Sequence, residues 1–467
     1  MREGRQTMTR TDDTLTAIDA DAGPALDRLF DFLRIPSVSA SPAHVADCER
    51  AADWLVAELR AIGFDAAKHL SEGKPMVVGR LGAGRRDAPH VLFYGHYDVQ
   101  PPDPLDLWRS PPFEPRLETG PNGERIVARG ASDDKGQLMT FVEACRAFQK
   151  FGGPPCEITV LIEGEEEVGS PSLPPFLAAN ADTLKADVAL VCDTGMWNPT
   201  TPAITTALRG IVADEVILTG ASRDLHSGIY GGVAANPIHA LARILGDLHD
   251  ESGAVALPGF YDGVEELADE IREQWAALDF DSAAFLRDVG LATPAGERGR
   301  TPLEQVWSRP TCEVNGIVGG YTGVGIKTVL PAKASAKVSF RLVGKQNPEK
   351  VVKSFRAFVT SRLPPDVKAE FIGHAGSPAI TLPVKNEALR CARRALETEW
   401  GRPAALIGCG GSIPVVGAFK RELKMDSLLV GFALEDDAAH SPNEKYERTS
   451  FHKGARSWAR ILAALAA

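Results

Sequence analysis

The feature that most constrains the fold is a short apolar run that ends in a cluster of carboxylates. Residues 158–162 read Ile-Thr-Val-Leu-Ile, as in a strand buried on both faces of a sheet, and glycines then break the run. Glutamates follow at once, at Glu163, Glu165, Glu166 and Glu167. Several carboxylates at one strand end cost electrostatic energy unless a cation or a proton compensates them. The ordinary alternative is a solvated acidic loop, so the choice depends on the rest of the chain.

Apolar strands and helices alternate along the first part of the sequence. Strands are predicted at 75–81, 90–94, 157–162 and 187–192. Helical patterns precede and separate them, at 24–33, at 45–59 and from Lys135 onward. This alternation predicts an α/β domain whose sheet is mostly parallel at its centre, with helices on both faces.

The pattern changes after residue 205. Half-exposed strands are predicted at 210–219, 333–343 and 367–373, with helices from Pro237 and over 348–363. Two helices on an antiparallel sheet form an α+β domain. The segment after residue 381 returns to the first pattern, and its apolar strand at 427–432 needs a sheet to join.

The predicted architecture is therefore an α/β domain interrupted by an insertion. We expect a disordered leader at 1–13, the first α/β part at 14–205, the inserted α+β domain at 206–381, and the second α/β part at 382–467.

The composition of the chain argues against nucleic acid and membranes as partners. The net charge of −11 disfavours nucleic acid, whose phosphates favour a basic face. No stretch reaches the ~18 apolar residues of a membrane span, and the polar start lacks the core of a signal peptide. The seven cysteines form no CxxC pair and are typical of buried thiols. We therefore predict a cytoplasmic protein without a nucleic-acid or membrane partner.

Metal-ligating side chains follow the predicted strands of the α/β domain, one set after another. Because ligands bind at the carboxyl ends of strands in such sheets, these groups are expected to converge. Two imidazoles and several carboxylates suit Zn²⁺ or Mn²⁺ better than Ca²⁺ or Cu(I). The groups are His96 and Asp98, Asp133 and Asp134, Glu165–Glu167, Asp193, and Glu435–His440.

Each of these groups has an ordinary structural explanation. His96 alone is typical of a hydrogen-bonded surface turn, Asp133 of a helix N-cap, and Asp193 of a turn. His440 in a loop is uninformative by itself. Their joint occurrence at strand ends is far less probable than any one of them, and it favours a metal site.

Five segments of the chain closely resemble the motifs of the M20 metallopeptidase family. They are 95–101 (Gly-His-Tyr-Asp-Val-Gln-Pro), 132–136 (Ser-Asp-Asp-Lys-Gly), 166–170 (Glu-Glu-Val-Gly-Ser), 224–228 (Asp-Leu-His-Ser-Gly) and 439–444 (Ala-His-Ser-Pro-Asn-Glu). The resemblance is strongest to the cytosolic dipeptidase and carnosinase branch. It covers nearly the whole chain after the leader, in order.

The resemblance implies two divalent ions per chain, bridged by Asp133. His96 and Asp193 complete the site of one ion, and Glu167 and His440 complete the other. Zn²⁺ is the first expectation and Mn²⁺ the second. Two ions ~3.5–4 Å apart activate a bridging hydroxide and polarise a carbonyl.

The resemblance also assigns the proton chemistry. Glu166 is the expected general base, and Asp98 the residue that hydrogen-bonds His96 and fixes its tautomer. The implied reaction is hydrolysis of the amide of dipeptides or short peptides, from the carboxyl end. One alternative is hydrolysis of N-acyl or N-carbamoyl amino acids. A non-catalytic binding protein is a second alternative, disfavoured because Glu166 and all five ligands are present.

The inserted domain resembles the lid and dimerisation domain of the family. His226 is expected to stabilise the oxyanion in the partner subunit's site of a homodimer, and Arg341 to bind the carboxylate of a small peptide substrate. Thr328, His374 and Ser412 are further candidate substrate contacts.

The chain departs from the branch at one place. The branch carries Arg-Glu before Gly-Gly-Ser-Ile-Pro, whereas this chain has Gly408 and Cys409. This difference leaves the substrate preference open, while the ligands are unaffected. Glu163 and Glu165 receive no chemical role, and we expect them to be ordinary solvated residues.

Overall fold

The computed structural model describes residues 2–70, 72–84, 87–383, 385–411 and 413–467. The chain divides into two compact units. Unit 1 comprises Met1–Thr206, Leu382–Ile407 and Pro414–Ala467, and unit 2 comprises Ala207–Thr381 and Gly408–Ile413. The insertion expected at 206–381 differs from unit 2 by one residue at its start and by the short segment 408–413, which the sequence pattern assigns to the α/β part.

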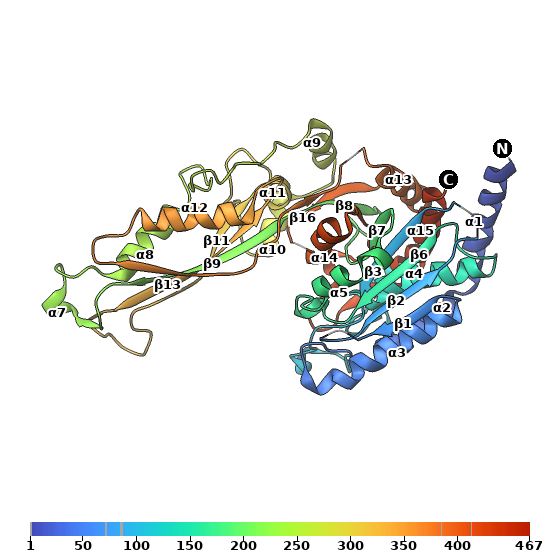
Figure 1. The fold of residues 1–467 in the computed structure, drawn as a ribbon, viewed down its shortest axis with the longest axis horizontal. Coiled ribbons are helices and arrows are strands. Elements are labelled where there is room, and N and C mark those ends of the chain that lie inside the picture. The colour runs from blue at the N-terminus through green and yellow to red at the C-terminus, as the bar shows by residue number, and fades with distance from the viewer. Residues whose placement is uncertain (1, 71, 85–86, 384, 412) are drawn as a thin grey trace. The chain divides into compact units, whose positions relative to one another are not determined.

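Unit 1 is built on a mixed sheet whose centre is parallel. The pairings of β6 with β3, β3 with β7, and β7 with β17 are all parallel, whereas the outer pairings are antiparallel. This arrangement confirms the predicted α/β fold class (Figure 1). The strand order is β1 (Asp65–His69), β2 (Met76–Leu81), β6 (Glu157–Glu163), β3 (His90–His96), β7 (Val188–Val191), β17 (Ser427–Leu429), β8 (Ala203–Leu208) and β15 (Ile380–Thr381), and β16 (Ala405–Cys409) also pairs with β8.

Helices cover both faces of this sheet. Successive residues of a strand point to opposite faces, and β3 shows the consequence. The ring of Phe93 stacks on Phe141 of helix α4 (Lys135–Gln149), with centroids 3.8 Å apart. The ring of Tyr94 packs on Phe419 of the π-helical turn η4 (Phe419–Leu423). The apolar run of β3 is therefore buried on both sides, as its sequence predicts.

The remaining elements of unit 1 surround the sheet. A small antiparallel sheet of order β18–β5–β4 lies apart from the main one. The other elements are α1 (Arg2–Ala20), α2 (Ala22–Leu33), η1 (Pro42–His44), α3 (Val45–Ala61), η2 (Leu105–Leu107), β4 (Arg116–Gly120), β5 (Gly123–Val127), η3 (Glu166–Val168), α5 (Leu173–Ala179), α6 (Ala181–Leu184), α13 (Glu387–Trp400), α14 (Pro414–Ala418), η5 (Glu435–Asp437), β18 (Lys445–Glu447) and α15 (Arg448–Leu465).

Unit 2 is built on a four-stranded antiparallel sheet of order β11–β13–β9–β14. Alternate residues of its strands point into an apolar core formed with two helices, α8 (Pro237–Gly246) and α12 (Pro348–Thr360). Both helices begin with an asparagine cap followed by proline, which explains where they start. The other elements are β9 (Gly210–Thr219), β10 (Leu225–His226), α7 (Ser227–Tyr230), α9 (Asp269–Ala276), α10 (Ser282–Asp288), α11 (Pro302–Trp307), β11 (Thr311–Gly319), β12 (Val329–Leu330), β13 (Lys333–Leu342), β14 (Lys368–Gly373) and β15 (Ile380–Thr381).

The sequence predicts a disordered leader at 1–13. Helix α1 begins at Arg2 and includes that segment. Leu15 and Ile18 on the same helix are buried, and the Thr14 hydroxyl donates to the carbonyl of Arg10 at 2.8 Å. The polar start therefore continues a helix whose later turns pack on the core.

The described residues contain no helix that combines the length and the apolar character needed to cross a membrane.

Candidate metal centre and active site

The expected metal ligands all lie in unit 1, at one edge of its sheet. His96 ends β3, Glu167 lies in the turn η3 after β6, and Asp193 follows β7. Because these strands are parallel, their carboxyl ends meet at the same edge. Asp133 directly precedes the N-cap of α4, and His440 follows η5. The ligands that follow successive strands in the sequence therefore lie close together in space.

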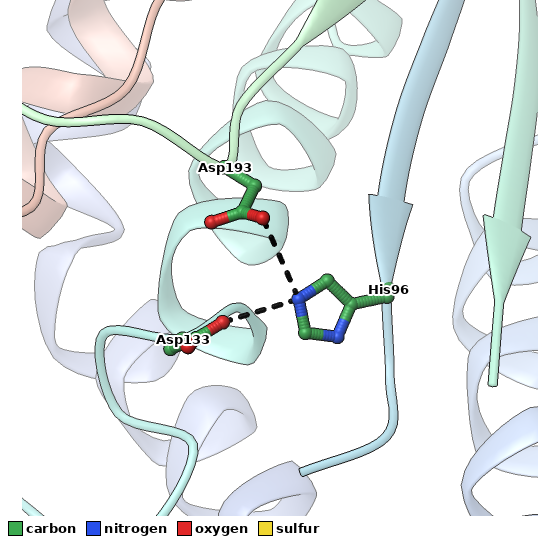
Figure 2. Close-up of side chains that lie close together, drawn as sticks. All are labelled: His96, Asp133 and Asp193. Atoms are coloured by element: carbon green, nitrogen blue, oxygen red, sulfur yellow. Dashed lines mark hydrogen bonds and ion pairs between the residues drawn. The ribbon is translucent and has the colours of Figure 1, made fainter. Parts of the chain in front are cut away.

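The first group of ligands is His96, Asp133 and Asp193 (Figure 2). Nε2 of His96 lies 3.1 Å from Oδ1 of Asp133 and 3.9 Å from Oδ2 of Asp193. The three ligand atoms all lie within 4.8 Å of one another. His96 is fully buried, so its ring is held in place by packing as well as by polar contacts.

The second group shares Asp133 with the first. Nε2 of His440 lies 2.9 Å from Oδ2 of Asp133 and 3.2 Å from Oε2 of Glu167. Asp133 therefore directs one carboxylate oxygen to each imidazole. This is the arrangement that a bridging ligand between two cations requires.

The ring of His96 is oriented by Asp98 through the main chain. Nδ1 of His96 donates to the carbonyl oxygen of Asp98 at 3.0 Å, while the Asp98 carboxylate oxygen Oδ1 is 3.4 Å away. A donating Nδ1 leaves the lone pair of Nε2 for a cation.

The carboxylate of Asp98 also holds the glutamate turn. It accepts the backbone N–H of Glu166 at 3.2 Å on Oδ1 and that of Glu167 at 3.1 Å on Oδ2. Glu167 is further fixed by Gln100, whose amide nitrogen Nε2 donates to its carboxylate at 2.7 Å. Asp98 thus connects the loop of His96 to the turn that carries both glutamates.

Glu444 is a site residue to which the sequence analysis gave no role. Its buried carboxylate accepts the backbone N–H groups of Gly130, Ser132 and Asp133 at 2.9, 2.9 and 3.0 Å, and Nη1 of Arg129 at 2.8 Å. Glu444 therefore fixes the loop that presents Asp133. It lies in the segment 439–444, so the resemblance marked its position without indicating what it binds.

The electrostatics of the cluster favour a cation. Burial first, and then the charges of Asp133 and Asp134, raise the pKa of Asp193 well above its usual range. Hydrogen bonds to Asp133 and Glu167 raise the pKa of His440 to about 10. Burial also raises the pKa of Glu166. Carboxylates gathered in this way beside two imidazoles form a nitrogen and oxygen donor set that fits divalent ions such as Zn²⁺.

The expectation that Glu163 and Glu165 are solvated is wrong, because both side chains are buried. Oε1 of Glu163 accepts the hydroxyl of Tyr94 at 2.5 Å and that of Ser170 at 2.9 Å. Its other oxygen, Oε2, has no hydrogen-bond partner in the described part of the chain. Burial raises the pKa of Glu163 to about 7.

The remaining candidate residues belong to unit 2, and the structure does not bring them all together. His226 is exposed at the end of β10, where its Nδ1 accepts the backbone N–H of Gly228. It pairs with Val329 of β12, next to Thr328, whose carbonyl accepts the N–H of Ser227. His226 and Thr328 are therefore neighbours.

Arg341 lies at the other end of the sheet of unit 2. The strand β13 runs ten residues from Lys333, which follows β12 closely, to Leu342. At roughly 3.4 Å per residue its length is about 30 Å. Within one chain, Arg341 and His226 are thus separated by about the length of this strand.

His374 is exposed just beyond β14, and its backbone N–H donates to the carbonyl of Ala213. It lines a cavity of about 690 Å³ together with Asn347, Lys353 and Arg356. Ser412 lies outside the described residues.

The departure at Gly408 has a steric explanation. A β-carbon built on Gly408 would lie 2.5 Å from the β-carbon of Trp307. The close approach of α11 therefore leaves no room for a side chain at position 408.

Comparison with known proteins places the chain in a family. The sequence model of peptidase family M20/M25/M40 matches residues 92–464, so the chain belongs to this family. It is accordingly a metal-dependent hydrolase, a metallopeptidase of the M20 type, as the sequence predicted.

Individual relatives of the chain have names that are more specific than that of the family. The chain is 32% identical over 453 residues to the Cys-Gly metallodipeptidase DUG1 of Candida albicans, with 92% of each chain covered. It is 29% identical over 398 residues to the human Beta-Ala-His dipeptidase, covering 84% of this chain and 78% of that protein. The solved structure of the M20 metallo-carboxypeptidase Sso-CP2 from Sulfolobus solfataricus has a TM-score of 0.81 and 30% identity, covering 95% of this chain and 99% of that one.

Proposed function

We propose that the protein is a dinuclear metallodipeptidase that hydrolyses the amide bond of dipeptides or short peptides from the carboxyl end. The observation that carries the proposal is the position of Asp133 between two imidazole–carboxylate groups. Relatives named for Cys-Gly and Beta-Ala-His dipeptide hydrolysis support the substrate class.

His96, Asp133 and Asp193 would hold one divalent ion, and Asp133, Glu167 and His440 the other. The three carboxylates carry three negative charges and two such ions carry four positive charges, so one positive charge remains. Zn²⁺ is the first expectation and Mn²⁺ the second, because the donors are nitrogen and oxygen. When bound, such a pair lowers the pKa of water and polarises the scissile carbonyl.

Glu166 is the proposed general base. It accepts a proton from the attacking water, whose oxygen adds to the carbonyl carbon, and donates that proton to the amine as the C–N bond breaks. Two features of the chain suit Glu166 to this task. Asp98 fixes its backbone, and burial raises the pKa of its carboxyl, which brings it closer to neutral pH.

Unit 1 is the proposed catalytic domain, and unit 2 the lid and dimerisation domain. The strand β11 is an edge strand, and an exposed edge with apolar side chains is a common site of pairing between chains. Many apolar side chains of unit 2 are exposed, on α7 and just after it (Ile229, Tyr230, Val233), and on β11 and just after it (Val314, Ile317, Val318, Tyr321, Val324 and Ile326). A second copy of the chain is the proposed partner that covers them.

The homodimer also explains the separation of His226 from Arg341. Within one chain the two residues lie at opposite ends of the sheet of unit 2, so they do not contact one substrate together. In the proposed dimer, His226 stabilises the oxyanion in the site of the partner subunit. Arg341 is a half-buried residue that has no ion pair with the described residues, so its guanidinium can bind the substrate carboxylate. Thr328, His374 and Ser412 remain proposed substrate contacts.

We retain the cytoplasm as the proposed location. None of the seven cysteines forms a disulfide, and six of them are buried. Free thiols are typical of proteins in a reducing compartment.

A substrate panel tests the proposed function. Purified protein loaded with Zn²⁺ or Mn²⁺ is assayed with Cys-Gly, β-Ala-His and Gly-Xaa dipeptides beside N-acetyl and N-carbamoyl amino acids. We expect metal-dependent hydrolysis of the dipeptides, abolished by a chelator and restored by metal. Turnover of the N-acyl or N-carbamoyl compounds without dipeptide cleavage would contradict the proposal.

A further inference from the structure

Arg209 occupies the short link between β8 and β9 in unit 2, and its guanidinium hydrogen-bonds to main-chain oxygens. Nε donates to the carbonyl of Gly410 at 2.9 Å, and Nη1 lies 3.5 Å from the carbonyls of Gln305 and Arg309. Arg209 forms no ion pair with a carboxylate among the described residues. The guanidinium is half-buried and keeps its full positive charge.

The strand register places Arg209 beside Arg341. Arg341 is paired with Ile211 on one side and with Thr311 on the other. Arg209 lies two residues before Ile211, and Arg309, whose carbonyl faces the Arg209 guanidinium, lies two residues before Thr311. Burial and the charge of Arg341 lower the pKa of Arg209 to about 10, which leaves the side chain charged at neutral pH.

The surroundings of this pair supply little negative charge. Glu313 attracts Arg209, but it is exposed on β11 and forms no ion pair with it. Gly408 and Cys409, the residues before the Gly410–Gly411 turn, carry no carboxylate. The positive charges of Arg209 and Arg341 repel each other, and an anion bound between them would offset that cost.

We propose that Arg209 is a specificity-determining residue that forms, with Arg341, a site for the two carboxylates of a dipeptide ending in aspartate or glutamate. This inference rests on the proposed function, in which Arg341 binds the α-carboxylate. Arg209 then binds the side-chain carboxylate of the same residue, next to the Gly410–Gly411 turn.

Matched substrates separate this role from simple anchoring of the Gly410 turn. We would measure kcat/KM for Ala-Glu against Ala-Gln and for Ala-Asp against Ala-Asn, which differ in charge but hardly in shape. The wild type should prefer the acid by about tenfold, which corresponds to about 1.4 kcal/mol. In Arg209→Gln the acid-to-amide ratio should fall to about one, and Arg209→Lys should retain part of the preference.

Arg287→Gln is the matched control, because it removes an arginine charge from an exposed position of unit 2. Its acid-to-amide ratio should equal that of the wild type. Product inhibition of the wild type provides a measurement that does not depend on any variant. Glutamate should inhibit more strongly than glutamine, again by about tenfold.

The outcomes are distinct. Equal cleavage of acid and amide substrates by the wild type overturns the assignment, while the dipeptidase function stands. A ratio unchanged in Arg209→Gln, even with a lower rate for both substrates, also overturns it and makes Arg209 only an anchor. If the wild type cleaves none of the dipeptides, the proposed function fails and this assignment fails with it.

Discussion

The carboxylate of Asp98 accepts the backbone N–H of Glu166, with oxygen and nitrogen 3.2 Å apart. The two residues follow different strands, β3 and β6, which are parallel neighbours in the sheet. Through this bond the loop after one strand fixes the proposed base that follows the other. The side chain of Asp98 therefore acts on Glu166 at least as directly as on His96, whose ring is held by the Asp98 carbonyl.

Replacing Asp98 by Asn should impair turnover more than metal binding. The NH2 group of the new side chain would face a backbone N–H that a carboxylate oxygen of Asp98 accepts in the wild type. The main-chain carbonyl that orients His96 is unchanged. We expect kcat to fall about 10–100-fold, the usual cost of removing such a supporting contact, with metal content close to that of the wild type. Unchanged kcat at full metal occupancy would refute this role.

Replacing Glu444 by Gln should weaken the metal site. The carboxylate accepts four hydrogen bonds, two on each oxygen and three of them from the backbone around Asp133, so the NH2 group of an amide would face two of these donors. We expect metal affinity to fall about 10–100-fold in a competition with a chelator. The matched control is Glu435→Gln, an exposed residue of η5, which should bind metal like the wild type. Equal affinity of all three proteins would show that Glu444 does not position Asp133.

Mixed dimers test whether His226 serves the partner subunit. His226→Ala and Glu166→Gln should each be inactive alone. A mixed dimer would contain one site with an intact Glu166 and an intact His226, so random mixing should restore about a quarter of the wild-type activity. Two different affinity tags would isolate the mixed species. Inactive mixed dimers of verified composition would argue against the shared site.

His90 predicts a dependence of stability on pH. Burial lowers its pKa, and Nε2 lies 2.8 Å from the hydroxyl of Thr159. Because the folded pKa lies below the unfolded value of about 6.5, this contribution to stability is present above that value and is lost as the pH falls below it. Urea unfolding of metal-free protein at pH 7.5 and 5.5 should show a smaller loss for His90→Gln than for the wild type. Identical losses would exclude His90 as a source of this dependence.

The sequence predicts those parts of the structure in which the local pattern and the final environment agree. The apolar runs at 90–94 and 157–162 form β3 and β6 because strands buried on both faces need no polar side. The alternation at 333–343 forms β13 because its polar face remains partly open. The ligand cluster follows from the strand ends, since parallel strands bring their carboxyl ends to one edge.

Other features depend on contacts between distant segments and leave no local signal. Glu163 looks like a solvated glutamate, yet Tyr94, which is 69 residues away in sequence, provides a buried hydroxyl for it. The absence of a side chain at Gly408 is explained only by Trp307, on a helix that the sequence pattern did not reveal. Glu444 acts on a loop more than 300 residues earlier in the chain. Such pairs become visible only when the fold is known.

The most direct test of the central claim is the turnover of Glu166→Gln measured on protein whose metal content is known. If Glu166 moves the proton at a two-metal centre, the variant should bind two divalent ions per chain, like the wild type. It should lose about 10²–10⁴-fold in kcat for a dipeptide, the usual contribution of a general base. A variant that retains both metal ions and hydrolyses the dipeptide at the wild-type rate would contradict the account.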